Sequence, residues 1–236
     1  MTRRRFIADE VSNNRAALVG EHAEHLARVL RARVGQEFDI AIGHGVRRGK
    51  ITSLTKARIE FDLGEEVLSA AVADITLLLA VFKFDRMEWA IEKCTELGVA
   101  RIVPVIAQRT DPHLATASAK RVERWQRIAL QASEQSRRAV PPQIADPIRL
   151  SETLTVPGAR RIVLAESERQ HLLTDVLQND SSGDVLNMAV GPEGGWTEGE
   201  LQSFQKSGWI SASLGNTILR AETAAIAALA VATALM

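Results

Sequence analysis

Cysteine is almost absent from this chain, which contains a single one, Cys94, among its 236 residues. One thiol excludes an internal disulfide and any metal site built from several cysteines, and it is typical of a reducing compartment. Long apolar runs are absent too, since the longest, residues 224–236, is too short and too rich in alanine to span a bilayer. Acidic residues follow the basic start at 3–5, so no signal peptide is expected. We therefore predict a cytoplasmic protein with no membrane partner.

Motifs of several enzyme classes are missing as well. The chain has no Gly-x-Ser-x-Gly elbow, and no Gly-Lys-Ser/Thr follows the glycine-rich stretch at 191–195, which argues against hydrolases and phosphate-loop enzymes. The glycines at 43–49 miss the dinucleotide-binding spacing by one residue, so a hairpin turn is expected there. His22 and His25 share a predicted helix but lack a third ligand, so we expect no metal site.

An excess of either charge is missing too, because 29 Lys and Arg balance 29 Asp and Glu. These charges are unevenly distributed along the chain. Residues 1–58 hold 12 basic against 6 acidic side chains and residues 101–150 hold 9 against 4, whereas the blocks 59–100 and 151–236 are acidic. Phosphate binding depends on local positive surface, so the pattern is compatible with a nucleic-acid partner, and equally with a set of solvated faces.

Residues 1 to about 70 predict a small β-rich unit, because short β-compatible runs alternate with turns rich in glycine or charge. The expected strands are residues 38–42, 49–54 and 57–61. A helix is expected at 22–31, where apolar side chains share one face, and residues 64–71 are the expected linker.

From residue 75 onward, apolar strands alternate with long helices, which is typical of a parallel sheet in an α/β fold. The predicted strands are 75–82, 101–106, 161–165, 186–190 and 209–214, and helices are predicted at 118–137 and 221–236. Two further helices are expected to begin at capping boxes, residues 85–88 and 197–200. Cys94 falls in the apolar stripe of the first of these and is expected in the core.

Two loops in the last third of the chain, 191–195 and 213–223, each follow a predicted strand and open a helix, where open α/β sheets bind ligands. Glycines in the first loop let the backbone approach a ligand, although a tight turn also needs them. The positive charge of Arg220 is unfavourable at the start of a helix, so a role in binding a ligand would explain it. The negative charge of Glu222 is favourable there, so Glu222 is also explained as a helix cap. The polar helix end at 134–138 either faces the same cleft or is a plain terminus.

Several motifs in this order resemble the RsmE family, bacterial methyltransferases of small-subunit ribosomal RNA in the SPOUT superfamily. They are Arg4 and Phe6 with residues 25–31, then 92–99, 134–136, 191–195, 214–215 and 218–223. The resemblance implies an α/β fold in two domains: a small PUA-like β-barrel RNA-binding domain at 1–70, and a SPOUT methyltransferase domain with a parallel sheet and a trefoil knot at 72–236. Such knots are rare exceptions among protein folds.

The resemblance also implies a mechanism and an assembly. S-adenosylmethionine would donate a methyl group to N3 of a specific uridine in the 16S rRNA of the small ribosomal subunit, and the chain would form a homodimer with active sites near the interface. Arg220 would stabilise negative charge on uracil, and Glu222 would orient the loop or act as base. The residues expected to bind the cofactor are Leu164, Ala165, Glu166, Gly191, Pro192, Glu193, Gly195, Leu214, Gly215, Ile218 and Leu219.

RNA contacts are expected from basic residues near the N-terminus and at the end of the 118–137 helix, namely Arg3, Arg4, Arg5, Arg47, Arg48, Lys50, Arg137 and Arg138. The chain departs from the family pattern at Asn216-Thr217, where Pro-Arg is common, and at Arg137, where glycine is usual. The first departure removes a basic contact near the cofactor loop, and the second offers a replacement. Two other functions stay open: a related SPOUT enzyme that methylates a ribose or another base, and a non-catalytic ribosome-assembly factor.

Overall fold

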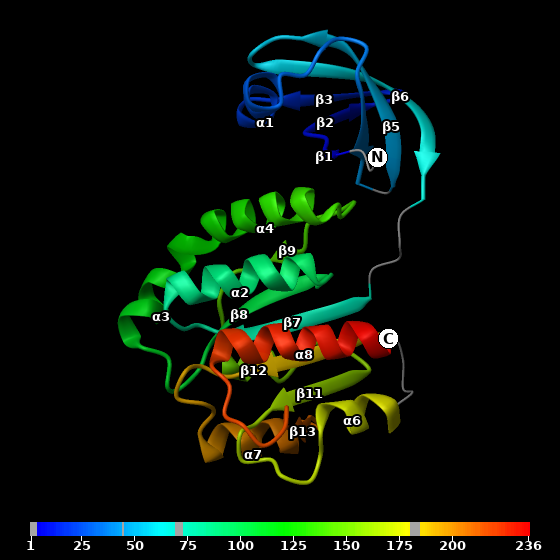
Figure 1. The fold of residues 1–236 in the computed structure, drawn as a ribbon. Coiled ribbons are helices and arrows are strands. Elements are labelled where there is room, and N and C mark those ends of the chain that lie inside the picture. Colours follow the sequence, from blue (N-terminus) through cyan, green and yellow to red (C-terminus); the bar gives the residue numbers. More distant parts are fainter. Residues whose placement is uncertain (1–3, 44, 69–72, 180–184) are drawn as a thin grey trace. The chain divides into compact units, whose positions relative to one another are not determined.

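The computed structural model describes residues 4–43, 45–68, 73–179 and 185–236, whose path is coloured along the chain in Figure 1. These residues belong to two compact units, one of Met1–Ala71 with Ser133–Pro141 and the other of Val72–Ala132 with Pro142–Met236. A segment from the middle of the chain therefore joins the N-terminal unit, a feature that the contiguous division at residues 70–72 did not anticipate. Each unit has its own apolar core.

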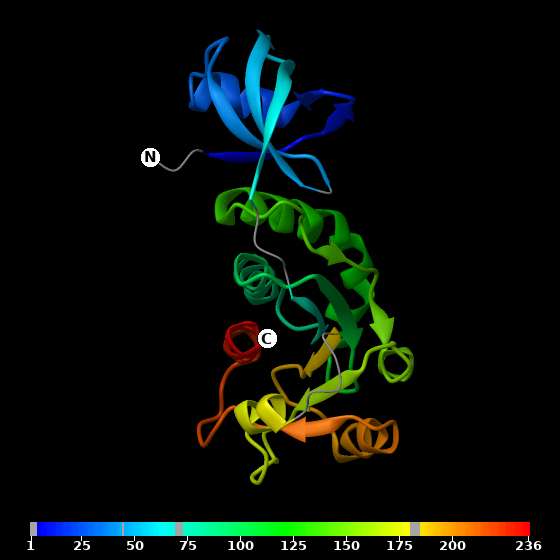
Figure 2. The same cartoon turned by 90° about the vertical axis from the view of Figure 1, so that its right-hand side faces the viewer.

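The first unit is a curled six-stranded sheet, a half-barrel, in the strand order β1-β4-β5-β6-β3-β2 (Figure 2). Its strands are β1 (Arg5–Ile7), β2 (Glu10–Ser12), β3 (Arg15–Val19), β4 (Glu37–Ala41), β5 (Val46–Leu54) and β6 (Arg58–Val67). Helix α1 (Glu21–Glu24) continues into a π-helical turn, η1 (His25–Val29). All neighbouring strands are antiparallel except the parallel pair β1 and β4. Leu18, Leu26 and Phe61 are fully buried inside the curl.

Two local predictions for this unit have different outcomes. The hairpin expected at 43–49 is confirmed, because β4 and β5 are antiparallel and the Ile42 amide donates to the Gly45 carbonyl at 2.9 Å. The linker expected at 64–71 is wrong over residues 64–67, where β6 continues to Val67, and its residues 69–71 lie outside the described part. The long β6 pairs along much of β5, and this pairing extends the strand past the charged residues that suggested a linker.

The second unit contains a parallel sheet in the order β10-β8-β7-β12-β11-β13, with β9 beside β8. Its strands are β7 (Asp74–Ala80), β8 (Arg101–Ile106), β9 (Gln143–Ile144), β10 (Ile148–Arg149), β11 (Arg160–Leu164), β12 (Val185–Val190) and β13 (Ile210–Ala212). Every one of these pairings is parallel, which confirms the α/β fold predicted from the alternation of strands and helices. The three-residue β13 and two-residue β10 form its edges.

Helices cover both faces of this sheet (Figures 1 and 2). They are α2 (Phe84–Glu96), α3 (Pro112–Ser118), the 3-10 turn η2 (Ala119–Arg121), α4 (Val122–Ser136), α5 (Leu150–Thr153), α6 (Leu173–Asn179), α7 (Glu198–Lys206) and α8 (Ala221–Leu235). Odd-numbered apolar residues of β7, such as Leu77, pack with α2, α6 and α8, whereas Leu78 packs with α7. A strand covered on both faces is apolar throughout, which explains the continuous run in the sequence.

The capping box predicted for α7 is present, whereas the one predicted for α2 is not. Thr197 caps α7 and its own amide donates to the Glu200 carboxylate at 2.8 Å, as the capping box predicts. The box expected at 85–88 is wrong, because α2 already begins at Phe84 after Lys83 and has no side-chain cap. Glu88 instead accepts two hydrogen bonds from Arg124 of α4, at 2.6 and 2.7 Å.

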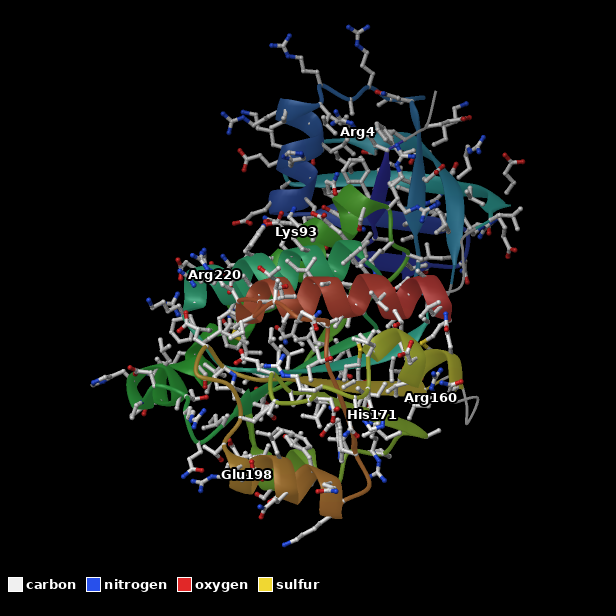
Figure 3. The ribbon with its side chains drawn as sticks, turned by 60° about the horizontal axis from the view of Figure 1, so that its bottom comes forward. Arg4, Lys93, Arg160, His171, Glu198 and Arg220 are labelled. Carbon is white, nitrogen blue, oxygen red and sulfur yellow. The ribbon has the colours of Figure 1, made fainter. Side chains whose placement is uncertain are left out.

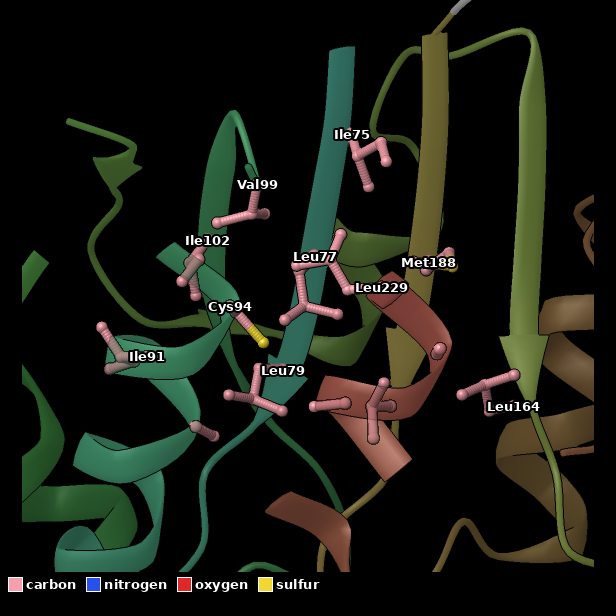
Figure 4. Packing of buried hydrophobic residues seen from close by; sticks show 14 of the residues in the cluster. Ile75, Leu77, Leu79, Ile91, Cys94, Val99, Ile102, Leu164, Met188 and Leu229 are labelled. Carbon is pink, nitrogen blue, oxygen red and sulfur yellow. The ribbon is translucent and has the colours of Figure 1, made fainter. Parts of the chain in front are cut away.

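Cys94 lies between α2 and the sheet, with Leu77, Leu79 and Leu229 around it in Figure 4. It has no exposed surface, and burial raises the pKa of its thiol to about 12. The prediction of a core residue is confirmed. Among the described residues, no helix combines the length and the apolar character needed to cross a membrane.

Candidate active site at the carboxyl ends of three strands

A cavity of about 240 Å³ lies where β11, β12 and β13 end. These strands are neighbours in the parallel sheet, so their carboxyl ends bring three following loops to one place. The cavity wall is made by residues 164–167, 190–196 and 212–215 with 217–219, joined by Arg109, Arg169, Leu201, Ala221 and Ala224. It is a mixed wall, in which apolar side chains and loop backbone stand beside a few charged groups.

All eleven residues predicted to bind the cofactor lie in this wall. They come from three segments that are far apart in the sequence and meet only because β12, β11 and β13 are adjacent. The predicted catalytic residues Arg220 and Glu222 are not part of the wall, although their neighbours Leu219 and Ala221 are. The structure therefore places the eleven predicted cofactor residues in the cavity wall, and Arg220 and Glu222 beside it.

Two glycines in the wall have backbone angles that other residues rarely adopt. Gly195 has φ of 68° and donates its amide to the Pro192 carbonyl at 2.8 Å, which closes a tight turn. Gly215 has φ of 113°, and an added Cβ would meet no atom within 4 Å. At Gly215 the backbone conformation, and not lack of space, requires glycine.

Sequence reasoning missed the arginine that holds the first loop. Arg109 follows β8, and its Nη1 donates to the carbonyl of Gly194 at 2.5 Å and to that of Trp196 at 3.5 Å. Ser167 and Arg169 of the wall were missed too. Arg109 could have been found, because it follows a predicted strand at the same edge of the sheet as the two glycine-containing loops.

Arg220 is the N-cap residue of α8, in an extended conformation, with its carbonyl bonded to the Ala224 amide at 2.8 Å. Its side chain is exposed at the start of that helix (Figure 3) and forms no hydrogen bond or ion pair within the described part of the chain. A guanidinium at this position opposes the positive end of the helix dipole. The arrangement leaves a free cation beside the cavity, available to a ligand that carries negative charge.

Glu222 has the opposite environment. Only 3% of the residue is exposed, and its Oε1 lies 3.7 Å from Nη1 of Arg86 on α2. The first turn of α8 also favours a negative charge at this position. Of the two predicted roles, this burial favours orientation of the loop and disfavours proton transfer from a substrate in solution.

The residues predicted to bind RNA differ in the exposure of their side chains and in whether those side chains are already bonded within the protein. The side chains of Arg4 and Lys50 are exposed and have no partner among the described residues. Arg47 is anchored to the carbonyls of Leu63 and Gly64 and to Asn14 Oδ1, at 2.8 to 3.0 Å. Arg48 is paired with Glu65 at 3.2 Å, and Arg5 donates to the carbonyl of Arg137, whose side chain is exposed. Arg3 lies outside the described residues.

Arg138 is poorly placed for a direct contact with phosphate. Only 9% of the residue is exposed, its Nε donates to the Val140 carbonyl at 3.2 Å, and burial lowers the pKa of its guanidinium to about 10. A buried, internally bonded guanidinium supports the fold around it. Of the predicted cations, Arg138 is therefore the one that the geometry favours least.

Arg137 occupies a position that normally requires glycine. Its φ is 61°, and it follows the last residue of α4, Ser136. The Arg138 amide donates to the Ser133 carbonyl at 2.8 Å and the Arg137 amide to the Glu134 carbonyl at 3.3 Å, which is the Schellman pattern of a helix end. A left-handed position of this kind favours glycine, and here an arginine occupies it.

Replacing Arg137 with glycine is expected to stabilise the protein by about 1 kcal/mol, because the strain of a left-handed L-residue is removed. Urea unfolding measures the change. Gln135→Gly is the matched control: it lies in the helical part of α4, so glycine there is expected to destabilise by about 0.5–1 kcal/mol. Destabilisation by Arg137→Gly would contradict the strain argument.

His22, one of the two histidines considered as metal ligands, has another role. His22 Nδ1 is 2.9 Å from Oδ1 of Asp9, and the other oxygen of Asp9 accepts the Val19 amide at 2.8 Å. His22 therefore ties α1 to the strands of the first unit. Within the described parts of the chain, no three His, Cys, Asp or Glu side chains gather into a site for a metal ion.

Comparison with known proteins decides the family. Residues 69–233 match the profile described as an RNA methyltransferase domain. The ribosomal RNA small subunit methyltransferase E of Synechocystis is 31% identical over 97% of this chain and 76% of its own length, and that of Aquifex aeolicus is 30% identical over 94% and 95%. The chain belongs to the ribosomal RNA small subunit methyltransferase E family. The resemblance found in the sequence is thereby confirmed.

Two solved structures have the same fold as this chain, and one of them is a ribosomal RNA small subunit methyltransferase E. That of Neisseria gonorrhoeae, bound to S-adenosyl methionine, is 32% identical with a TM-score of 0.85 and covers 97% of this chain and 96% of its own. A methyltransferase of Legionella pneumophila in complex with the same cofactor is 25% identical with a TM-score of 0.87, over 99% and 98% of the two chains. This family fold places the cavity described above in a methyltransferase domain.

Proposed function

We propose that this member of the methyltransferase E family transfers a methyl group from S-adenosylmethionine to N3 of a specific uridine in the 16S rRNA of the small ribosomal subunit. The observation that carries the proposal is the cavity at the ends of β11, β12 and β13, whose wall contains every residue expected to hold the donor. Relatives with this name and with bound S-adenosyl methionine support it.

The chemical character of the wall fits the donor. Leu164, Leu214 and Ile218 offer apolar surface for an adenosine ring, and the two glycine-containing loops bring backbone groups close to it. The Trp196 side chain lines the cavity, and its Nε1 is buried without a hydrogen-bond partner among the described residues. Arg169 is exposed in the wall and free of partners in that part of the chain, so it is the cation available to the donor's carboxylate.

When bound, S-adenosylmethionine supplies an electrophilic methyl group on a sulfonium. The task of this chain is to present N3 of uracil to that methyl in line and without its proton. N3 lies on the Watson–Crick edge, so the nucleotide must be unpaired or flipped out. Arg220 is free and beside the cavity, where its charge stabilises the uracil carbonyls as N3 loses its proton. Glu222 orients the first turn of α8.

The first unit supplies the RNA contacts, and Arg4 and Lys50 are two predicted contacts whose side chains are exposed and unpaired among the described residues. The double variant Arg4→Ala, Lys50→Ala is expected to weaken binding to small subunits and to lower the slope of log K against log salt by about 2, one for each lost phosphate contact. Binding measured at several salt concentrations checks this. Arg15→Ala, which removes an exposed cation 3.6 Å from Asp62, is the control and should leave the slope within about 0.5. An unchanged slope in the double variant would place RNA elsewhere.

The deciding experiment is methylation of small subunits that lack the modification, with the product mapped to a nucleotide and identified by nucleoside mass spectrometry. N3-methyluridine at one 16S position supports the proposal. A ribose-methylated or differently methylated nucleoside would assign the chain to another SPOUT activity. Failure to bind S-adenosylmethionine in calorimetry would favour a non-catalytic assembly factor.

Three further properties are part of the proposal. The chain works as a homodimer, threads its C-terminal segment through a trefoil knot, and acts in the cytoplasm. Family membership supports the first two, and Trp89 on α2 and Leu235 at the end of α8 are exposed apolar side chains, 48% and 42%, that suit a subunit interface. A molar mass from light scattering near twice 25.8 kDa is the expected result for the dimer.

A further inference from the structure

Arg86 joins two segments of the candidate site that are separate in the sequence. It lies in the first turn of α2, and one guanidinium nitrogen, Nη1, is 3.5 Å from Glu193 Oε1 and 3.7 Å from Glu222 Oε1. Glu193 belongs to the glycine-rich loop after β12, and Glu222 to the first turn of α8. A single cation therefore lies between two carboxylates, one from a loop of the cavity wall and one from the helix turn beside it.

The two carboxylates differ in burial, and this difference assigns their roles. The side chain of Glu222 is 4% exposed, and its Oε2 is buried without a hydrogen-bond partner in the described part of the chain. A buried carboxylate needs a compensating charge, which Arg86 and the start of α8 provide. Glu193 is 38% exposed and lies in a loop, so its charge depends less on Arg86 than that of Glu222 does. The pair of Arg86 with the buried Glu222 is the anchor, and Glu193 attaches the loop to it.

Arg86 itself does not line the cavity, whereas Glu193, Pro192 and Gly195 of its attached loop do, as do Ala221 and Ala224 of α8. We propose that Arg86 is a positioning residue, which ties the 191–196 loop to the first turn of α8 and thereby sets the affinity of the site for the methyl donor. The statement about affinity rests on the proposed function, and the statement about the loop rests on geometry alone. Arg109 holds the same loop from its other side, through the carbonyls of Gly194 and Trp196.

Calorimetric titration of the full-length protein with S-adenosylmethionine tests the effect on affinity. Arg86→Met removes the charge and keeps most of the length, and it is expected to raise Kd about tenfold because the loop loses its preferred position. Glu193→Gln should raise Kd in the same direction. In the double variant the two effects should not multiply, since both remove one contact. Arg86→Lys should recover part of the affinity.

The matched control is Arg124→Met. Arg124 forms a close ion pair with Glu88, two residues from Arg86 on the same helix, but it does not touch the cavity loops. Its Kd should stay within twofold of the wild-type value. If Arg86→Met fails to fold because Glu222 is left buried and unpaired, Glu193→Gln still tests the loop contact, since it leaves the anchor pair intact.

Hydrogen exchange without any donor gives a second readout that a general loss of stability does not reproduce. Arg86→Met and Glu193→Gln should speed exchange at 193–197 while exchange in β8 is unchanged. Wild-type affinity in both variants, or effects on Kd that multiply, would overturn the inference. If the wild-type protein itself binds no S-adenosylmethionine, the proposed function fails. Hydrogen exchange in the variants then tests the contact between Arg86 and the 191–196 loop by itself. Faster exchange at 193–197 supports that contact, and unchanged exchange overturns it.

Discussion

Arg220→Ala is expected to lower kcat on small ribosomal subunits by about 10²–10³-fold, the loss seen when one donor that stabilises developing negative charge is removed. The affinity for S-adenosylmethionine should stay within about twofold, because Arg220 does not line the cavity and its side chain has no partner among the described residues. Its backbone carbonyl, which accepts the Ala224 amide, is kept in the variant. The helix start is therefore preserved while the charge is lost.

Single-turnover methylation with saturating donor measures this effect apart from product release. Arg220→Lys keeps the charge but not the planar fork, so it should recover only part of the rate. Lys206→Ala, which removes an exposed cation at the end of α7, is the control and should react at the wild-type rate. Full turnover by Arg220→Ala would show that another group stabilises the uracil.

Gly215→Ala is expected to raise the Kd for S-adenosylmethionine by about 5- to 150-fold. The φ of 113° at this position lies where L-residues are strained by about 1–3 kcal/mol, so the loop after β13 would leave its conformation. No atom lies within 4 Å of an added Cβ, which means that a steric clash cannot account for the loss. The loop provides Leu214, Ile218 and Leu219 to the cavity wall, so its displacement removes apolar surface from the donor site.

Calorimetry with S-adenosylmethionine checks the value, and Gly199→Ala provides a matched control. Gly199 lies in the first turn of α7, where a Cβ would also meet nothing within 4 Å but the backbone has an ordinary helical φ. Its substitution should leave Kd unchanged and stabilise α7 slightly, since alanine is the better helix former. Equal affinities for the two variants would show that the conformation at Gly215 does not shape the site.

Much of the second unit could be predicted from the sequence because its signals are local. The strand at 101–106 has the predicted bounds, and the one predicted at 186–190 begins a single residue earlier, at Val185. The helix predicted from residue 221 begins there as α8. A strand buried on both faces is continuously apolar, and a helix after it begins at a polar or glycine-containing loop, so both features are readable without the fold.

The short elements could not be predicted in the same way. Strands β1, β2, β9 and β10 have two or three residues each, too few to show a period of two. The turn η1 is π-helical, which the spacing at 22–31 does not distinguish from an α-helix. The left-handed conformation of Arg137 was not predicted either, because the sequence has an arginine where this conformation favours glycine.

The sequence by itself determined the fold class, the family and the three segments that form the cavity wall. These follow from apolar periodicity, from glycines at strand ends, and from motifs in order along the chain. Tertiary structure alone decided which charged groups act together. Arg86 meets Glu193 across 107 residues and Arg109 meets Gly194 across 85. The end of a predicted strand places Arg109 at this edge of the sheet, but no local pattern encodes either contact. It also decided that Arg220 is free and Glu222 is buried, because the exposure of a side chain depends on elements from elsewhere in the chain that pack around it.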